Sequence, residues 1–217
     1  MTGIELGPGV VAFRGILEAG TPTHSYAIMC GDFSVLVDVR DESAIPALRE
    51  LPRPRHLLLT HRHVRKHERA IQHAFGLDVW LHAADASAPR RGPAEHTPHA
   101  ETYRDPYAEP QVLAALGFTF LHVPGHTPGC SFVMLDRDGG MLFTGDAVVG
   151  VKPGQPAGIE LPPDWTCDDA AASRSAVLAI APSLPPHRAI LPSHGEPIAN
   201  ATVAFTRGLW EGLRAPS

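Results

Sequence analysis

The sequence predicts an α/β sandwich in which helices cover the faces of β-sheets. Short apolar and β-branched runs, typical of buried strands, outnumber the segments that suit helices. Some helical segments fall between these runs, an order typical of layered α/β folds. The 217-residue chain is 44% hydrophobic and 19% charged, which is typical of a globular protein. We see no repeat and no linker that would divide it, so a single domain over residues 1–217 is expected.

In the N-terminal part of the chain, apolar or alternating runs predict strands at Val10–Leu17, Tyr26–Met29, Phe33–Val39, His56–Leu59 and Asp78–Leu81. Two helices are expected between them. One spans Glu42–Leu51, with Asp41 as its N-cap, and the other spans Lys66–Phe75, which Gly76 would end.

In the C-terminal part, strands are expected at Phe118–Val123, Ser131–Leu135, Met141–Thr144 and Ala189–Leu191. Helices are expected at Cys167–Ala181 and Ala199–Leu213. Residues 87–110 and 150–164 are rich in proline and glycine without periodicity, so they predict two long surface loops.

Composition excludes several classes of protein. The net charge of −5 argues against a broadly basic surface for nucleic acids. The three cysteines, Cys30, Cys130 and Cys167, form no CxxC pair, so neither a disulfide framework nor a cysteine zinc site is predicted. No apolar run is long enough to span a membrane, and the first residues carry no secretory signal pattern. We therefore expect a reduced, cytoplasmic protein with no membrane or nucleic-acid partner.

Metal-competent side chains follow four of the expected strands. His61 and His63 come after an apolar strand, and at a spacing of two their side chains point to the same side of an extended chain. His126 lies in the turn VPGHTPG, Asp146 in LFTGD and His194 in LPSHGE. Three histidines and a carboxylate suit zinc or another borderline divalent ion. The sequence therefore predicts a metal site where these strand ends converge.

The order of these motifs resembles the metallo-β-lactamase-fold superfamily, most closely its glyoxalase II and persulfide dioxygenase branch. The resemblance extends from Ser25-Tyr26 and the LVDV strand with Asp38, through THRH, VPGHTPG and FTGDA, to PSHGE. It implies an αββα sandwich of two mixed sheets with the metal site at one edge. It also implies that His61, His63 and His126 match the first metal site, that Asp146 bridges, and that His194 belongs to the second site. Asp38 matches a position that would orient a ligand imidazole.

The chain departs from the family pattern HxHxDH, because residues 61–66 are HRHVRK. Arg65 stands where the family has Asp, and Lys66 where it has His. A guanidinium cannot coordinate a metal, and two cations would repel a second divalent ion. A conventional two-metal site is therefore not expected. Three alternatives remain: one metal held by His61, His63, His126 and Asp146; replacement of the lost histidine by His67; or no metal, with Arg65 and Lys66 binding an anion.

The leading functional hypothesis is a metal-dependent hydrolase of an ester, thioester, lactone or amide, with one zinc ion. Asp146 would orient the attacking water, and Arg65 would pair with Asp146 or hold an anionic substrate group. The first alternative is a metal-poor pseudoenzyme or a protein that binds an anion or small molecule. The second is a sulfur dioxygenase with one iron, since histidines and a carboxylate also suit Fe(II). The expected partner is a small-molecule substrate, and a homo-oligomer is left open.

Overall fold

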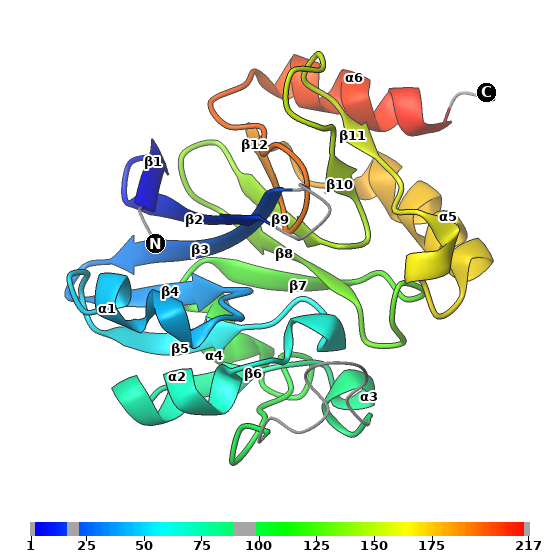
Figure 1. Cartoon of the computed structure of the whole chain (residues 1–217). Coiled ribbons are helices and arrows are strands. Elements are labelled where there is room, and N and C mark those ends of the chain that lie inside the picture. Colours follow the sequence, from blue (N-terminus) through cyan, green and yellow to red (C-terminus); the bar gives the residue numbers. More distant parts are fainter. Residues whose placement is uncertain (1–2, 17–21, 89–98, 215–217) are drawn as a thin grey trace.

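The computed structural model describes residues 3–16, 22–88 and 99–214 and arranges them as helices around two β-sheets (Figure 1). The strands are β1 (Gly3–Gly7), β2 (Val10–Ile16), β3 (Pro22–Cys30), β4 (Phe33–Val37), β5 (Pro54–Leu58), β6 (Asp78–Trp80), β7 (Phe118–His122), β8 (Ser131–Leu135), β9 (Met141–Gly145), β10 (Val149–Gly150), β11 (Ile159–Glu160) and β12 (Ala189–Pro192). The helices are α1 (Ile45–Leu48), α2 (Glu68–Phe75), α3 (Ala83–Ala86), α4 (Pro110–Ala114), α5 (Ala170–Ile180) and α6 (Val203–Arg214).

Both main sheets mix parallel and antiparallel strands. The first has the order β1-β2-β3-β4-β5-β6, and the second has the order β12-β9-β8-β7. In the first sheet β4, β5 and β6 run parallel, while in the second only β12 and β9 do. The pair β10-β11 forms a separate small ribbon. The two mixed sheets that the sequence and its resemblance imply are therefore present.

Three apolar clusters define four layers. Alternation along β4 sends Val35 and Val37 into a cluster with residues of the second sheet, such as Phe143, so this cluster fills the space between the sheets. Leu36 points the other way, into a cluster with Ile71 of α2. The outer face of the second sheet packs against α5 and α6 through a third cluster that includes Trp210. The result is an αββα sandwich, with α1 and α2 on one outer side and α5 and α6 on the other (Figure 1).

Most of the expected elements are present, with differences that have local causes. The strand β1 was not expected, and the expected helix Glu42–Leu51 is instead a 3₁₀ turn (Glu42–Ala44) followed by the four-residue α1. Pro46 occupies the first turn of α1, where its missing N–H is harmless, and therefore begins a helix rather than continuing one. Asp41 caps this segment as expected, accepting a hydrogen bond from the Ser43 N–H (2.9 Å).

The second expected helix begins later than predicted. Lys66 and His67 precede α2, which starts at Glu68 and ends at Gly76 in the left-handed conformation, φ 67°. The expected loop 150–164 contains the short β10-β11 ribbon at its edges. Of the other expected loop, residues 89–98 lie outside the described residues, and Pro110 begins α4. Within the described residues, no helix is long and apolar enough to cross a membrane.

A buried histidine joins α6 to the segment before β12. His187 Nδ1 donates to the carbonyl oxygen of Pro185 (2.8 Å), and Trp210 Nε1 donates to His187 Nε2 (2.8 Å). Because Nε2 accepts a hydrogen bond, it carries no proton, so the ring is neutral in this arrangement. Burial lowers the pKa of His187 below its ordinary value of 6.5.

We predict that His187 stays neutral, with its proton on Nδ1, at pH values where unfolded histidine is half protonated. The unfolded chain takes up this proton near pH 6.5 and the folded chain does not, so this group makes stability fall as the pH drops below about 6.5. Nitrogen NMR of the ring measures this directly. Trp210→Phe removes the donor to Nε2 and should raise the pKa of His187. An ordinary pKa for His187 in the wild type would contradict the prediction.

Candidate metal centre

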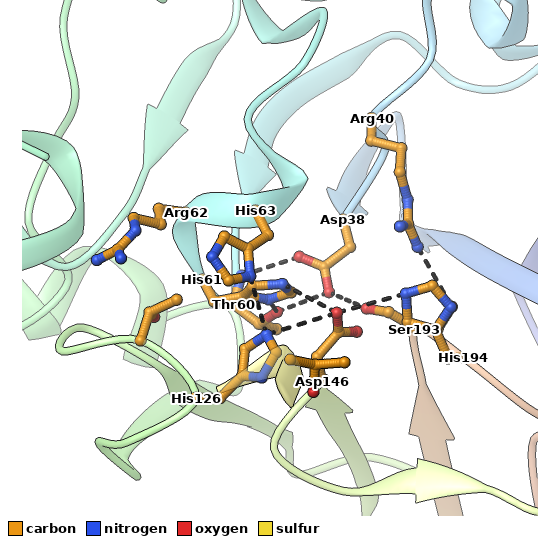
Figure 2. A network of polar contacts seen from close by, with 12 residues as sticks. Asp38, Arg40, Thr60, His61, Arg62, His63, His126, Asp146, Ser193 and His194 are labelled. Carbon is orange, nitrogen blue, oxygen red and sulfur yellow. Dashed lines mark hydrogen bonds and ion pairs between the residues drawn. The ribbon is translucent and has the colours of Figure 1, made fainter. Parts of the chain in front are cut away.

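The candidate site lies where strands of both sheets end, and Asp38 fixes its first imidazole through Thr60. Asp38 follows β4 and accepts hydrogen bonds from the Thr60 N–H and from Thr60 Oγ1, both at 2.8 Å. Since Thr60 Oγ1 donates its single proton to Asp38, it must accept from His61 Nδ1 (2.9 Å). This fixes the tautomer of His61 and leaves Nε2 to face Asp146, as Figure 2 shows. The resemblance implied that Asp38 orients an imidazole, and the structure places Thr60 between them.

The five predicted ligand side chains lie together (Figure 2). One nitrogen of each of His61, His63 and His126 lies within 4.8 Å of the others, close enough to hold one metal ion. His63 Nδ1 is 3.1 Å from His126 Nε2. Asp146 Oδ2 faces His61 Nε2 at 3.2 Å, His126 Nε2 at 3.6 Å and His194 Nε2 at 3.4 Å. A single carboxylate oxygen therefore points toward imidazoles from three different loops.

The electrostatics favour neutral imidazoles at His63 and His126 beside an ionised Asp146 carboxylate. Desolvation and the neighbouring His61 lower the pKa of His63 to about 4 and that of His126 to about 3. Burial would also lower the pKa of His61, but the Asp146 carboxylate outweighs it and raises that pKa. Burial opposes ionisation of Asp146, yet His61 and His194 hold its pKa well below the usual range. Two histidines thus keep the free lone pairs that metal binding requires at neutral pH.

These residues fit a metal ion. His61 Nε2 and Asp146 Oδ1 are buried and have no well-formed hydrogen bond to any described residue. Such atoms are costly to bury unless a partner satisfies them. Three imidazole nitrogens and one carboxylate oxygen form a donor set that zinc prefers, and iron also accepts. A cation held by these groups would give His61 Nε2 the partner that it lacks.

Glycine is required where the two sheets meet at the site. Gly145 ends β9 with φ 54°, a left-handed conformation that favours glycine. A Cβ atom at this position would lie 2.3 Å from Thr60 Oγ1. Gly145 therefore lets β9 approach the Thr60–His61 segment closely enough for Asp146 to face His61.

Asp85, which the sequence reasoning missed, joins the loops that carry the histidines. Its carboxylate is fully buried and accepts from the N–H of Arg62 (2.8 Å), from Thr127 Oγ1 (2.5 Å) and from the N–H of Gly129 (2.9 Å). Arg62 lies between His61 and His63, and its guanidinium pairs with Asp168 just before α5. Asp85 belongs to no recognisable motif, so only the folded chain reveals this role.

Cys167 and Arg40 are two further neighbours of the site that the sequence reasoning did not assign. The Sγ of Cys167 lies 3.7 Å from His126 Nδ1, the ring nitrogen opposite the one that faces the centre. Arg40 Nη2 donates to the carbonyl oxygen of Ser193 (3.2 Å), beside His194 (Figure 2). Arg40 lies in the segment that follows β4, two residues after Asp38, so its place near a strand end was a signal available in the sequence.

Arg65 turns away from the centre. Its guanidinium is buried and donates to the carbonyl oxygens of Ala86 (3.0 Å) and Ala88 (2.5 Å), at the end of α3. Among the contacts of Arg65 within the described residues, we do not find the ion pair with Asp146 that we expected as one option. His67 also lies apart from the centre, with Nδ1 3.5 Å from Glu42 Oε1. Arg65 acts here as a structural cation, and His67 does not replace the missing ligand.

Comparison with known proteins identifies the fold. No family model and no curated protein matches the sequence. Solved structures do match: a metallo-beta-lactamase from Erythrobacter litoralis is 22% identical, with a TM-score of 0.67 over 97% of this chain and 96% of that one. The metallo-beta-lactamase FIM-1 from Pseudomonas aeruginosa, in its mono-zinc form, is 23% identical, with a TM-score of 0.63 over 99% and 96%. This chain has the metallo-β-lactamase fold.

A further solved structure with this fold shows a different metal content. TTHA1623, in a di-iron-bound form, is 23% identical, with a TM-score of 0.60 over 91% of this chain and 98% of that one. Solved proteins with the metallo-β-lactamase fold thus include zinc and iron forms. The fold therefore does not decide which metal this chain takes, and that choice depends on the chain's own residues.

We predict that Asp85→Asn weakens both the fold and the metal site. The amide offers one acceptor oxygen where the carboxylate has two, so at least one of the buried donors of Arg62, Thr127 and Gly129 loses its partner. The free energy of unfolding should fall by about 2 kcal/mol. Zinc affinity should fall by about tenfold, since the carboxylate holds both histidine loops. Denaturant unfolding and zinc titration measure these effects, with the exposed Asp32→Asn as the control. Unchanged zinc affinity would contradict this role.

Arg65→Met is predicted to lower stability without changing the metal content. The variant keeps the length of the side chain but leaves the carbonyls of Ala86 and Ala88 without their charged donor. The cost in unfolding free energy should be about 2 kcal/mol. Arg49→Met, at the exposed residue that follows α1, serves as the matched control and should be close to neutral. A change in metal per chain in Arg65→Met would restore a direct role for this residue in the site.

Proposed function

We propose that this protein is a hydrolase that uses one metal ion, zinc by preference, to cleave an ester, thioester, lactone or amide. The observation that carries the proposal is the cluster of His61, His63 and His126 around Asp146, with two buried polar atoms that have no well-formed hydrogen bond within the described residues. The replacement of the family's Asp and His by Arg65 and Lys66 supports one metal ion instead of two. The expected partner is a small molecule.

His61, His63 and His126 would hold the ion, with Asp146 as the fourth ligand. A bound zinc ion would polarise a carbonyl oxygen and lower the pKa of water. Asp146 Oδ1 has no partner among the described residues, so it can accept a hydrogen bond from the attacking water and orient it. The side chain of His194 is 21% exposed while that of His61 is fully buried. His194 is therefore the imidazole placed to exchange a proton with a leaving group.

The positions of the ligands depend on residues that never touch the ion. Thr60 holds His61 in one tautomer, and Cys167 lies against His126 Nδ1, so both rings present Nε2 to the centre.

The three cysteines are free, which supports a reducing compartment, and we propose the cytoplasm.

Untagged protein reconstituted with zinc should hold one ion per chain, measured by elemental analysis. His63→Ala should weaken zinc binding by about 100-fold, because it removes one of three imidazoles. His73→Ala, which removes an exposed histidine from α2, should leave zinc binding unchanged.

Asp146→Asn should lower kcat at least tenfold on an ester or thioester that the wild type cleaves.

Failure to bind any metal would overturn the hydrolase proposal and favour a binding role. Binding of iron, together with oxygen consumption in the presence of a persulfide, would replace it with the dioxygenase. Two zinc ions per chain would refute the single-metal part of the proposal.

A further inference from the structure

The turn that carries His126 rests on the beginning of α5. The N–H of Asp168 donates to the carbonyl oxygen of His126 (3.1 Å), and the N–H of Asp169 donates to that of Gly125 (3.0 Å). Gly125 has φ 130°, and a Cβ atom there would lie 2.1 Å from the backbone nitrogen of Ser173. Glycine therefore lets the turn come this close to the helix. The position of His126 thus depends on where α5 begins.

The segment 167–169 fixes that beginning through local contacts. Asp169 is the N-cap of α5 and accepts a hydrogen bond from the N–H of Ala172 (2.9 Å). The Sγ of Cys167 lies 3.7 Å from His126 Nδ1. Three consecutive residues before α5 therefore contact the His126 turn or cap the helix beneath it. The side chain of the middle one, Asp168, extends instead to the other histidine loop.

Arg62 is the partner of Asp168 in that loop. It lies between His61 and His63, and its Nη2 donates to the Asp168 carboxylate. The side chain of Arg62 is only 9% exposed and that of Asp168 is 29% exposed, so water screens this charge-assisted hydrogen bond less than one on the surface. Figure 2 shows the Arg62 side chain directed away from the imidazoles. Arg62 therefore acts on the neighbouring histidines through the backbone.

The two loops that this ion pair joins supply adjacent ligands. His63 Nδ1 is 3.1 Å from His126 Nε2, and the two rings are 4.9 Å apart and nearly perpendicular. His63 follows β5 of the first sheet and His126 follows β7 of the second, so strand pairing does not set the spacing of these rings. Asp85 joins the same loops from the side of α3, and the pair of Arg62 with Asp168 joins them from the side of α5.

We propose that Arg62 and Asp168 are positioning residues of the metal centre. Their ion pair holds the α5 support of His126 against the His61–His63 loop and thereby sets the spacing of the His63 and His126 rings. This inference deepens the proposed function and rests on it for the link to a metal ion, whereas the ring spacing exists without one. A preset spacing reduces the ordering that metal binding must bring about, so loss of the pair should weaken the binding of zinc.

Zinc titration of Arg62→Met, Asp168→Asn and the double variant tests the pair. Both single variants should bind zinc about tenfold more weakly than the wild type. An effect of charge alone would have opposite signs, because removal of a cation favours a nearby zinc ion and removal of an anion disfavours it. The double variant should bind as weakly as the weaker single variant, since the pair is already broken, whereas charge alone would return it near the wild type.

Two further variants serve as controls. Asp164→Asn makes the same change of charge at an exposed residue four positions before Asp168, and it should leave zinc binding unchanged. Arg62→Lys keeps the positive charge but lacks the planar guanidinium, so it should recover only part of the zinc affinity. It also replaces Arg62→Met in the comparison if thermal melting shows that Arg62→Met does not fold.

A second measurement needs no metal. In the metal-free wild type, NMR should show a nuclear Overhauser contact between the ring protons of His63 and His126. Arg62→Met and Asp168→Asn should lose most of its intensity, while Asp164→Asn should keep it. A merely structural role would lower the melting temperature of the two variants and leave both the ring contact and the zinc affinity of the folded protein unchanged.

The positioning role is refuted if the folded variants keep the ring contact and the zinc affinity of the wild type. It is also refuted if Arg62→Met tightens zinc binding while Asp168→Asn weakens it, and the proposed hydrolase would stand in both cases. Loss of the ring contact in both variants of a protein that takes no metal would support the positioning role and overturn the hydrolase.

Discussion

The buried carboxylate of Asp38 is the interaction on which the metal centre depends. It accepts from the N–H and hydroxyl of Thr60 after β5 and from Ser193 Oγ after β12, each at 2.8 Å. One acid therefore ties strand ends of both sheets together. Asp38 itself has φ 52°, a strained conformation for a residue with a side chain, which this set of hydrogen bonds holds in place. Because Thr60 gives its proton to Asp38, the tautomer of His61 follows from this network.

A second buried acid performs the same task on the other side of the centre. Asp85 holds the loop of His63 through the N–H of Arg62 and the loop of His126 through Thr127 and Gly129. The two networks share no residue, yet both end at imidazoles that face Asp146. The centre is thus organised by three buried acids, of which two act on backbone and hydroxyl groups and only Asp146 faces the imidazoles. Pre-set positions of this kind reduce the entropy that a bound ion would otherwise have to overcome.

The sequence predicted the sandwich and the convergence of five side chains because both depend on short-range patterns. Alternation along strands sets which residues face the core, and a polar residue just after an apolar strand must lie at a sheet edge. The direction of Arg65 could not be predicted in this way. It follows a 3₁₀ turn (Arg62–Val64) and has ψ 89°, outside helical geometry, so neither helical nor strand periodicity sets its orientation. Asp85 was missed for a different reason, since its partners are up to 44 residues away in the sequence.

Charge at the centre explains how the fold tolerates Arg65 and Lys66 at two positions where the resemblance implied metal ligands. Arg65 could be accommodated because it turned outward to the carbonyls of Ala86 and Ala88, where a guanidinium is stabilising. Lys66 stays close enough to Asp146 and Arg40 for their charges to act on its pKa. A second divalent ion would have to approach both cations, whereas an anion would be attracted by them. The positive charge at these positions therefore supports the proposal of a single metal ion at the centre.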